Sequence, residues 1–295
     1  MNRVRAWALA ARPRTLPAAA APVLVGTALA WQARGFAPGP AVAALAGALL
    51  LQVGSNFAND VYDYEKGADT DARLGPLRVT QAGLLSARDV KRGMRVVFGL
   101  AIFVGVYLTW VAGWPVVVIG LASIVAAMAY SGGPLAFGYR GLGDLFVMVF
   151  FGFVAVCGTA FVQTGDVPDA AWPAGLMVGA LATAILVVNN VRDHETDRVA
   201  GKRTLPAVLG RAAGVVEFAG LLIGAYAVAW WMVWRDLVDA WALLVFLTLP
   251  VAVVLIVDLR RYRGPVLNAT LARTAELLFL FCLLFSAGVA LGGHR

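Results

Sequence analysis

Nine long runs of apolar residues divide this chain, and short polar segments separate them. Each run is about 16–25 residues long, which suits a hydrocarbon layer about 30 Å thick. Because backbone groups in lipid must pair within their own segment, each run predicts a transmembrane helix. The expected spans are 15–33, 39–60, 96–112, 115–133, 143–164, 171–191, 212–234, 239–258 and 268–292.

Composition supports this interpretation. The chain is 61% hydrophobic and only 14% charged. It is therefore expected to be an all-α polytopic membrane protein in which residues 1–295 form one transmembrane domain. The same values exclude an ordinary soluble globule.

The positions of the basic residues predict how the helices cross the membrane. If the N-terminus is cytoplasmic, all of the 24 Lys and Arg residues except Arg34, Arg235 and Arg295 fall on the cytoplasmic side. This asymmetry is typical of proteins in an inner (plasma) membrane. It also explains the net charge of +7 without a nucleic acid partner.

Two acidic clusters lie where an apolar run meets the cytoplasm. The first contains Asn59, Asp60 and Asp63, with Asp69 behind it; the second contains Asn189, Asn190, Asp193 and Asp197. A spacing of three or four residues puts two carboxylates on one helix face, where they repel each other. A helix C-terminus also disfavours anions. A bound cation would offset both effects, so the clusters predict a metal site. Their matching positions on two helices suggest a parallel internal repeat that would let them face each other.

The surrounding residues favour a phosphate ligand. Oxygen ligands suit Mg²⁺, and a magnesium ion held by few carboxylates usually shares its coordination shell with phosphate oxygens. The residues expected to bind diphosphate are Asn56, Lys66, Arg73, Arg78, Asn189, Asn190, Arg192 and Lys202. A diphosphate at the membrane edge implies a lipid tail in the bilayer, as in a polyprenyl diphosphate. Metal-assisted loss of diphosphate would leave an allylic cation, from which water must be excluded.

These motifs resemble those of the UbiA-type intramembrane aromatic prenyltransferases. The first cluster is similar to the signature N-D-x-x-D-x-x-x-D and the second to D-x-x-x-D. Gly67 occupies the place of the last Asp of the first signature, and Asp69 follows two residues later. This longer form resembles the 1,4-dihydroxy-2-naphthoate polyprenyltransferases of menaquinone biosynthesis. The segments 11–17, 66–71, 75–83, 130–134, 141–144 and 201–205 point the same way.

The resemblance implies nine helices in a bundle around a central cavity open to lipid. Two Mg²⁺ ions would join the diphosphate to Asp60 and Asp63 on one side and to Asp193 and Asp197 on the other. Asn59 or Asp69 would complete the first metal site. The polyprenyl chain would pass to 1,4-dihydroxy-2-naphthoate with loss of CO₂ and diphosphate, and the product would be demethylmenaquinone.

The aromatic acceptor needs its own contacts. Arg14 and Arg140 are candidates to bind the naphthoate carboxylate, although cytoplasmic topology alone explains their positions almost as well. Tyr130 is a candidate to stabilise the allylic cation through its ring face. Interfacial anchoring is the alternative for this tyrosine.

Two alternative functions remain open at this point. The acceptor could be 4-hydroxybenzoate, homogentisate or a haem instead of the naphthoate. A transporter of ions or phosphate is an alternative of another class. Transport usually requires charged groups near the membrane midplane, whereas the acidic groups of this chain gather at one edge. The sequence therefore favours the enzyme.

Overall fold

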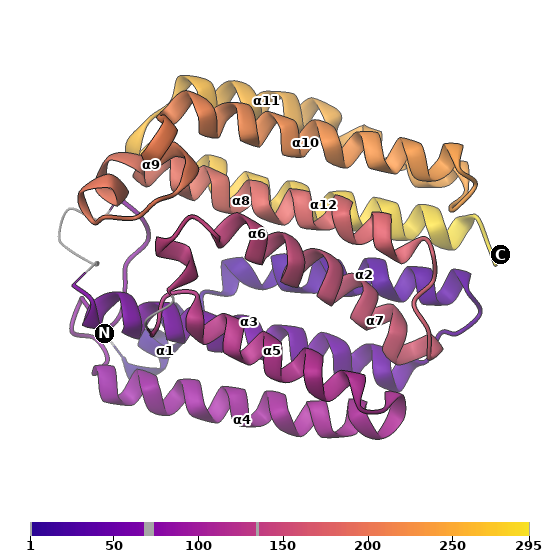
Figure 1. Cartoon of the computed structure of the whole chain (residues 1–295), viewed down its shortest axis with the longest axis horizontal. Helices are drawn as coiled ribbons and strands as arrows, with labels where there is room; N and C mark the ends of the chain where they lie inside the picture. Colours follow the sequence, from indigo (N-terminus) through magenta and orange to yellow (C-terminus); the bar gives the residue numbers. More distant parts are fainter. Residues whose placement is uncertain (1, 68–73, 134–135, 295) are drawn as a thin grey trace.

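The computed structural model describes residues 2–67, 74–133 and 136–294, and over these ranges the chain forms helices and connecting segments without strands (Figure 1). The α-helices are α1 (Arg3–Ala11), α2 (Leu16–Gln32), α3 (Pro38–Glu65), α4 (Ala87–Ala112), α5 (Pro115–Ala129), α6 (Gly143–Val147), α7 (Ala155–Thr164), α8 (Ala171–Val199), α9 (Leu205–Leu209), α10 (Arg211–Trp234), α11 (Leu249–Arg261) and α12 (Leu267–Leu291). Other helical elements join them: the 3₁₀ segments η1 (Pro13–Thr15), η2 (Phe137–Tyr139), η4 (Ala240–Thr248) and η5 (Gly264–Val266), and the π-helix η3 (Met148–Val154).

Each of the predicted apolar runs coincides with a helix or with a continuous series of helical segments. Among the described residues, seven of these are long and apolar enough to cross a membrane. Helix α5 is apolar but has only 15 residues, and α2 has 17. The chain is therefore a multi-pass membrane protein, as predicted.

Three helices extend five or more residues beyond the predicted spans. Helices α3 and α8 continue to Glu65 and Val199, and α4 begins at Ala87 rather than at residue 96. The added turns are rich in charged residues, which a hydropathy pattern assigns to loops although they are good helix formers. At α4, the Ser86 hydroxyl also accepts a hydrogen bond from the Asp89 N–H and caps the helix. The acidic clusters consequently lie within the last turns of α3 and α8.

Helix α8 forms the centre of the bundle. Of its most apolar stretch, 72% is buried inside the structure, the highest value of the seven candidate spans. Glycines allow η3 to lie directly against it. A Cβ atom on Gly152 would come within 2.4 Å of the Gly175 carbonyl oxygen and 2.8 Å of the Gly179 Cα atom. The π-helix was not expected from the sequence, whose apolar periodicity does not distinguish it from an α-helix.

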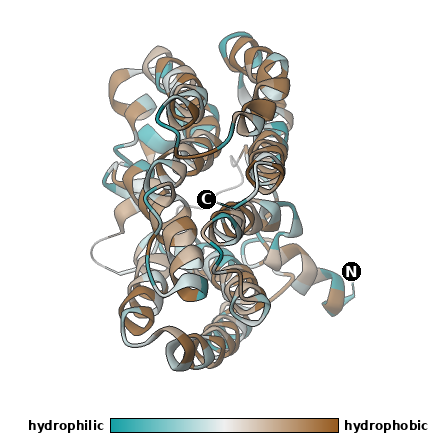
Figure 2. Cartoon of the chain, turned by 90° about the vertical axis from the view of Figure 1, so that its right-hand side faces the viewer, coloured by the Kyte–Doolittle hydropathy of each residue, from teal (hydrophilic) through white to brown (hydrophobic). Residues whose placement is uncertain are grey.

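Hydrophobic residues cover much of the outside of the bundle as well as its inside (Figure 2). Exposed large side chains include Phe103, Trp110, Val216 and Leu247. A soluble protein rarely exposes so much contiguous apolar surface, whereas a lipid-facing surface requires it.

Candidate functional site

The two acidic clusters lie at the same end of the bundle, near the loop that follows α3 and near α9 (Figure 1). Lys66 directly follows α3, and Lys202 lies shortly after α8. Both ammonium groups approach the ring of Tyr139, with Nζ at 4.9 Å and 5.0 Å from the ring centroid. Two segments far apart in the sequence thus meet at one aromatic ring.

Asp60 faces backbone donors. Its Oδ2 accepts a hydrogen bond from the Val79 N–H at 3.1 Å, and its Oδ1 accepts one from the Thr80 N–H at 3.0 Å. The residue is only 1% exposed. Charge-assisted hydrogen bonds of this kind are stronger than neutral ones, so Asp60 holds Val79 and Thr80 against the end of α3. The sequence did not indicate this structural role.

Asp63 lies between a cation and a phenol. Its Oδ2 accepts a hydrogen bond from Arg78 Nη2 at 2.9 Å, and its Oδ1 accepts one from the Tyr139 hydroxyl at 3.1 Å. Arg78 and Asp63 are both buried. Arg78 was predicted to bind diphosphate, and the structure gives it a carboxylate partner.

The side-chain amides of Asn59 and Asn56, both near the end of α3, form hydrogen bonds with different parts of the protein. Asn59 Oδ1 accepts a hydrogen bond from the Ser131 hydroxyl at 3.0 Å. Asn56 donates to the Ala11 carbonyl at 2.9 Å and to the Thr15 hydroxyl at 3.0 Å. Asn56 therefore ties the N-terminal segment to α3. Asn59 contacts Ser131, two residues after the end of α5.

Arg192 is the centre of the second cluster. Its guanidinium donates to Asp193 Oδ1 at 2.8 Å and to Asp193 Oδ2 at 2.5 Å, as well as to Asn189 Oδ1 at 2.6 Å. It also donates to Asn268 Oδ1 at 2.7 Å, and the Asn268 amide donates to the Leu74 carbonyl at 3.0 Å. Because the side chain of Arg192 is only 1% exposed, these contacts connect α8, α12 and the segment after α3.

Asp197 pairs with the lysine that follows it. Lys202 Nζ lies 3.1 Å from Asp197 Oδ1, and the Asp197 side chain is only 7% exposed. Asn190 does not share this contact: its amide nitrogen donates to Asp144 Oδ1, at the start of α6, at 3.4 Å. Among the predicted ligands on α8, Asp197 is therefore the one that contacts Lys202, and Lys202 also approaches the Tyr139 ring.

Tyr139 is a residue near the acidic clusters to which the sequence interpretation gave no role. Besides its contacts with Asp63, Lys66 and Lys202, its carbonyl oxygen accepts a hydrogen bond from the Arg203 N–H at 2.9 Å. Its spacing matched no motif, and a tyrosine in a polar loop is also typical of a membrane interface. Only the tertiary structure distinguishes the two roles.

Tyr130 joins the acidic groups to a cavity. Its carbonyl oxygen accepts a hydrogen bond from the Gly138 N–H at 2.9 Å, and the next residue, Tyr139, donates its hydroxyl to Asp63. Tyr130 also lines an apolar cavity of ≈ 340 Å³.

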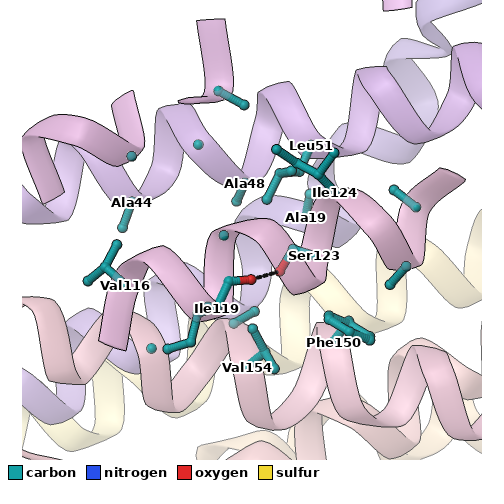
Figure 3. A pocket seen from close by; sticks show the side chains of 18 of the residues that line it. Ala19, Ala44, Ala48, Leu51, Val116, Ile119, Ser123, Ile124, Phe150 and Val154 are labelled. Atoms are coloured by element: carbon teal, nitrogen blue, oxygen red, sulfur yellow. Dashed lines mark hydrogen bonds between the residues drawn. The ribbon is translucent and has the colours of Figure 1, made fainter. Parts of the chain in front are cut away.

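This cavity lies between α2, α3, α4, α5 and the series from α6 to α7. Small and aliphatic side chains form most of its wall, as Figure 3 shows for Ala44, Ala48, Leu51 and Val154. The Ser123 hydroxyl, which is also in the wall, donates to the Ile119 carbonyl at 2.8 Å. The cavity therefore presents apolar surface to any occupant.

The remaining predicted residues lie in different environments. Arg14 is exposed in η1, at the start of α2, and Arg140 is exposed directly after Tyr139. Asp69 and Arg73 lie outside the described residues. Their predicted roles in metal and diphosphate binding stay predictions.

The donor set allows a test of whether a divalent cation fits. Within the described ranges, no three His, Cys, Asp or Glu side chains gather in a metal-binding group. Asp63 Oδ2 accepts a hydrogen bond from Arg78 and Oδ1 accepts one from Tyr139, and each oxygen can offer a further lone pair. Asp197 Oδ1 pairs with Lys202, and Asn59 contributes a neutral oxygen. A hard cation such as Mg²⁺ suits these oxygens when phosphate oxygens complete its shell. Asp60 fits less well, because both of its oxygens accept buried backbone N–H groups.

The helical arrangement is that of the solved UbiA homologs. Solved structures support the fold: a UbiA homolog from Archaeoglobus fulgidus bound to GPP and Mg²⁺ superimposes with a TM-score of 0.70 at 16% identity, covering 97% of this chain and 99% of that one. A UbiA homolog from Aeropyrum pernix K1 gives a TM-score of 0.70 at 17% identity, covering 99% of this chain and 98% of that one.

Sequence comparison identifies the family. Residues 19–283 match the UbiA prenyltransferase family, and the chain belongs to it. It is 37% identical to the 1,4-dihydroxy-2-naphthoate octaprenyltransferase of Escherichia coli (strain K12), over 99% of this chain and 97% of that protein. It is 35% identical to the Haemophilus influenzae protein of the same name, with the same coverage. The family resemblance stated from the motifs is confirmed. The chain is thus a prenyltransferase, and the transporter alternative loses its basis.

Proposed function

We propose that this enzyme transfers a polyprenyl chain from polyprenyl diphosphate to 1,4-dihydroxy-2-naphthoate, in menaquinone biosynthesis. Two relatives named 1,4-dihydroxy-2-naphthoate octaprenyltransferase match almost the whole chain. The observation in the structure that carries the proposal is the position of Tyr130. This residue lines the apolar cavity. Its carbonyl oxygen also accepts a hydrogen bond from the Gly138 N–H at 2.9 Å, directly before Tyr139, whose hydroxyl donates to Asp63. A lipid tail in the cavity would therefore bring its diphosphate to the acidic clusters.

The diphosphate would lie between the ends of α3 and α8. Asp63 and Asn59 would supply oxygen ligands on one side, with Asp193 and Asp197 on the other. Mg²⁺, when bound, would neutralise the charge that develops on the leaving diphosphate. Asp60 would contribute by ordering the segment that carries Arg78, while Lys66 and Lys202 would attract the diphosphate. Asp69 and Arg73 remain candidates for the same roles.

The chemical step breaks the bond between the first carbon of the prenyl chain and the diphosphate oxygen. Diphosphate keeps the electron pair, and the electron-rich ring carbon of the acceptor forms the new C–C bond. The carboxylate of that carbon then leaves as CO₂, and its bonding electrons return to the ring. The apolar cavity would exclude water from the cationic prenyl group. The Tyr130 ring would face this cation. Arg14 and Arg140 are the proposed partners of the acceptor carboxylate.

The proposed architecture is one transmembrane domain of nine spans around a central cavity open to lipid. This count adds α2 and α5 to the seven longer candidate spans. The basic residues support a cytoplasmic N-terminus and a site on the cytoplasmic side of the inner membrane.

The acceptor is tested by supplying purified protein in lipid vesicles with a labelled polyprenyl diphosphate, Mg²⁺ and one ring compound at a time. With 1,4-dihydroxy-2-naphthoate we expect released CO₂ and the labelled quinol, demethylmenaquinol, which is detected as demethylmenaquinone after oxidation by air. We expect no transfer to 4-hydroxybenzoate or homogentisate. Transfer to one of those rings, with none to the naphthoate, would contradict the proposed acceptor. Omitting Mg²⁺ is the control for metal dependence.

A further inference from the structure

Tyr139 is the residue at which the two halves of the site meet. Its hydroxyl donates to Asp63 at 3.1 Å, on the first acidic cluster. The ammonium groups of Lys66, at the end of α3, and Lys202, after the end of α8, both lie near its ring. Lys202 in turn pairs with Asp197 of the second cluster.

The backbone sets the position of Tyr139 independently of these side chains. The Tyr139 carbonyl accepts a hydrogen bond from the Arg203 N–H at 2.9 Å. Two residues later, Gly141 has a φ of +76°, and a Cβ atom there would lie 2.4 Å from the Arg203 carbonyl oxygen. The loop therefore lies directly against the chain that follows α8, and it brings the tyrosine to a fixed place between the clusters.

The hydroxyl acts on the orientation of Asp63. With Arg78 on Oδ2 and Tyr139 on Oδ1, both carboxylate oxygens have a donor. This fixes the plane of the carboxylate while leaving lone pairs for a metal. Such outer hydrogen bonds orient metal-ligating carboxylates, and their loss typically weakens metal affinity by 10–100-fold.

The ring acts on the two lysines. An ammonium group within about 6 Å of a ring centroid is attracted to the ring face. Lys66 and Lys202 meet this criterion at the same ring, although their like charges repel each other. An anion bound by both ammonium groups would offset that repulsion.

We propose that Tyr139 is a positioning residue with two separable tasks: its hydroxyl orients Asp63 for the metal, and its ring gathers Lys66 and Lys202 for the diphosphate. This inference rests on the proposed function. It makes the 3₁₀ turn η2 a part of the binding site that links the ends of α3 and α8.

Two substitutions separate the tasks. Tyr139→Phe removes the hydroxyl and keeps the ring, whereas Tyr139→Leu removes both. Tyr262→Phe is the matched control, because it deletes one tyrosine hydroxyl from the exposed segment between α11 and η5. Each variant is titrated with Mn²⁺ in the presence of inorganic diphosphate, and free Mn²⁺ is read by electron paramagnetic resonance. The rate of prenyl transfer is then measured at varied concentrations of Mg²⁺ and at varied concentrations of prenyl diphosphate.

For Tyr139→Phe we expect Mn²⁺ affinity to fall by roughly tenfold, with the KM for prenyl diphosphate nearly unchanged and kcat restored by excess Mg²⁺. For Tyr139→Leu we expect the KM for prenyl diphosphate to rise as well, by roughly tenfold. Tyr262→Phe should behave as the wild type.

Wild-type Mn²⁺ affinity in Tyr139→Phe would overturn the proposal, as would an equal rise of KM in both variants. If Tyr139→Leu does not fold, Tyr139→Phe alone decides whether the hydroxyl has its proposed task. A wild-type protein that transfers no prenyl group to any ring would instead refute the proposed function. The Mn²⁺ titration would still report on Asp63 in that case.

Discussion

Replacing Asp60 with Asn tests whether this residue orders the segment before α4. The carboxylate accepts the Val79 and Thr80 N–H groups at 3.1 Å and 3.0 Å. An amide has the same shape, but it keeps only one acceptor oxygen. Its NH₂ group would face the second backbone N–H, so one buried donor would lose its partner.

The magnitude follows from these contacts. A hydrogen bond to a charged group contributes about 1.5–3 kcal/mol, and a buried donor without a partner costs about 1–3 kcal/mol. Because the two values partly describe the same loss, we expect the local opening free energy to fall by about 3 kcal/mol. Amide hydrogen exchange at Val79 and Thr80 should then be roughly 100-fold faster.

The assay is hydrogen–deuterium exchange followed by mass spectrometry of the peptide that covers residues 74–85. Asp197→Asn is the matched control, because Asp197 pairs with Lys202 rather than with this segment. If Asp60→Asn left amide exchange in residues 74–85 unchanged and weakened Mg²⁺ binding, the structural role would be refuted. Asp60 would then be a metal ligand, as the sequence predicted. Prenyl transfer should fall in the variant, since Arg78 directly precedes Val79 and would lose its fixed position at Asp63.

Two further substitutions test the packing around the site. Arg192→Lys should lower the unfolding free energy by about 2 kcal/mol or more. One ammonium group cannot replace the two-point contact with Asp193 and the contacts with the Asn189 and Asn268 side chains. Thermal unfolding of the purified protein measures this change, and a melting curve like that of the wild type would contradict it. Gly152→Ala should cost about 1–3 kcal/mol, because the new methyl group would meet the Gly175 carbonyl oxygen at 2.4 Å. Gly99→Ala is the matched control, since a Cβ atom there meets nothing within 4 Å, and equal stability of the two variants would disprove the close-packing argument.

The sequence predicted the positions of the long helices because their lipid-facing and core residues are both apolar. It placed the start of α4 nine residues too late, since hydropathy does not register the charged helical turns that begin at Ala87. It also missed α1, which lies outside the apolar runs, and the π-helix η3. The periodicity of apolar residues contains no signal for any of these features.

The acidic residues were recognisable because like charges at helical spacing disfavour folding without a cation. Their individual partners were not recognisable. Asp60 and Asp63 share one helix end and one motif, yet one contacts backbone N–H groups and the other contacts Arg78 and Tyr139. That difference depends on how the segment from residue 74 returns to α3. No local pattern specifies this return.

The central claim is that the ends of α3 and α8 form one metal–diphosphate site. Its most direct test is the anomalous scattering of Mn²⁺ in crystals of the protein with an unreactive prenyl thiodiphosphate. The account predicts manganese peaks within about 2.2 Å of oxygens from Asp63 and Asp197, with the diphosphate between them and the tail in the apolar cavity. Manganese bound elsewhere, or a diphosphate that contacts only one of the two helix ends, would contradict it.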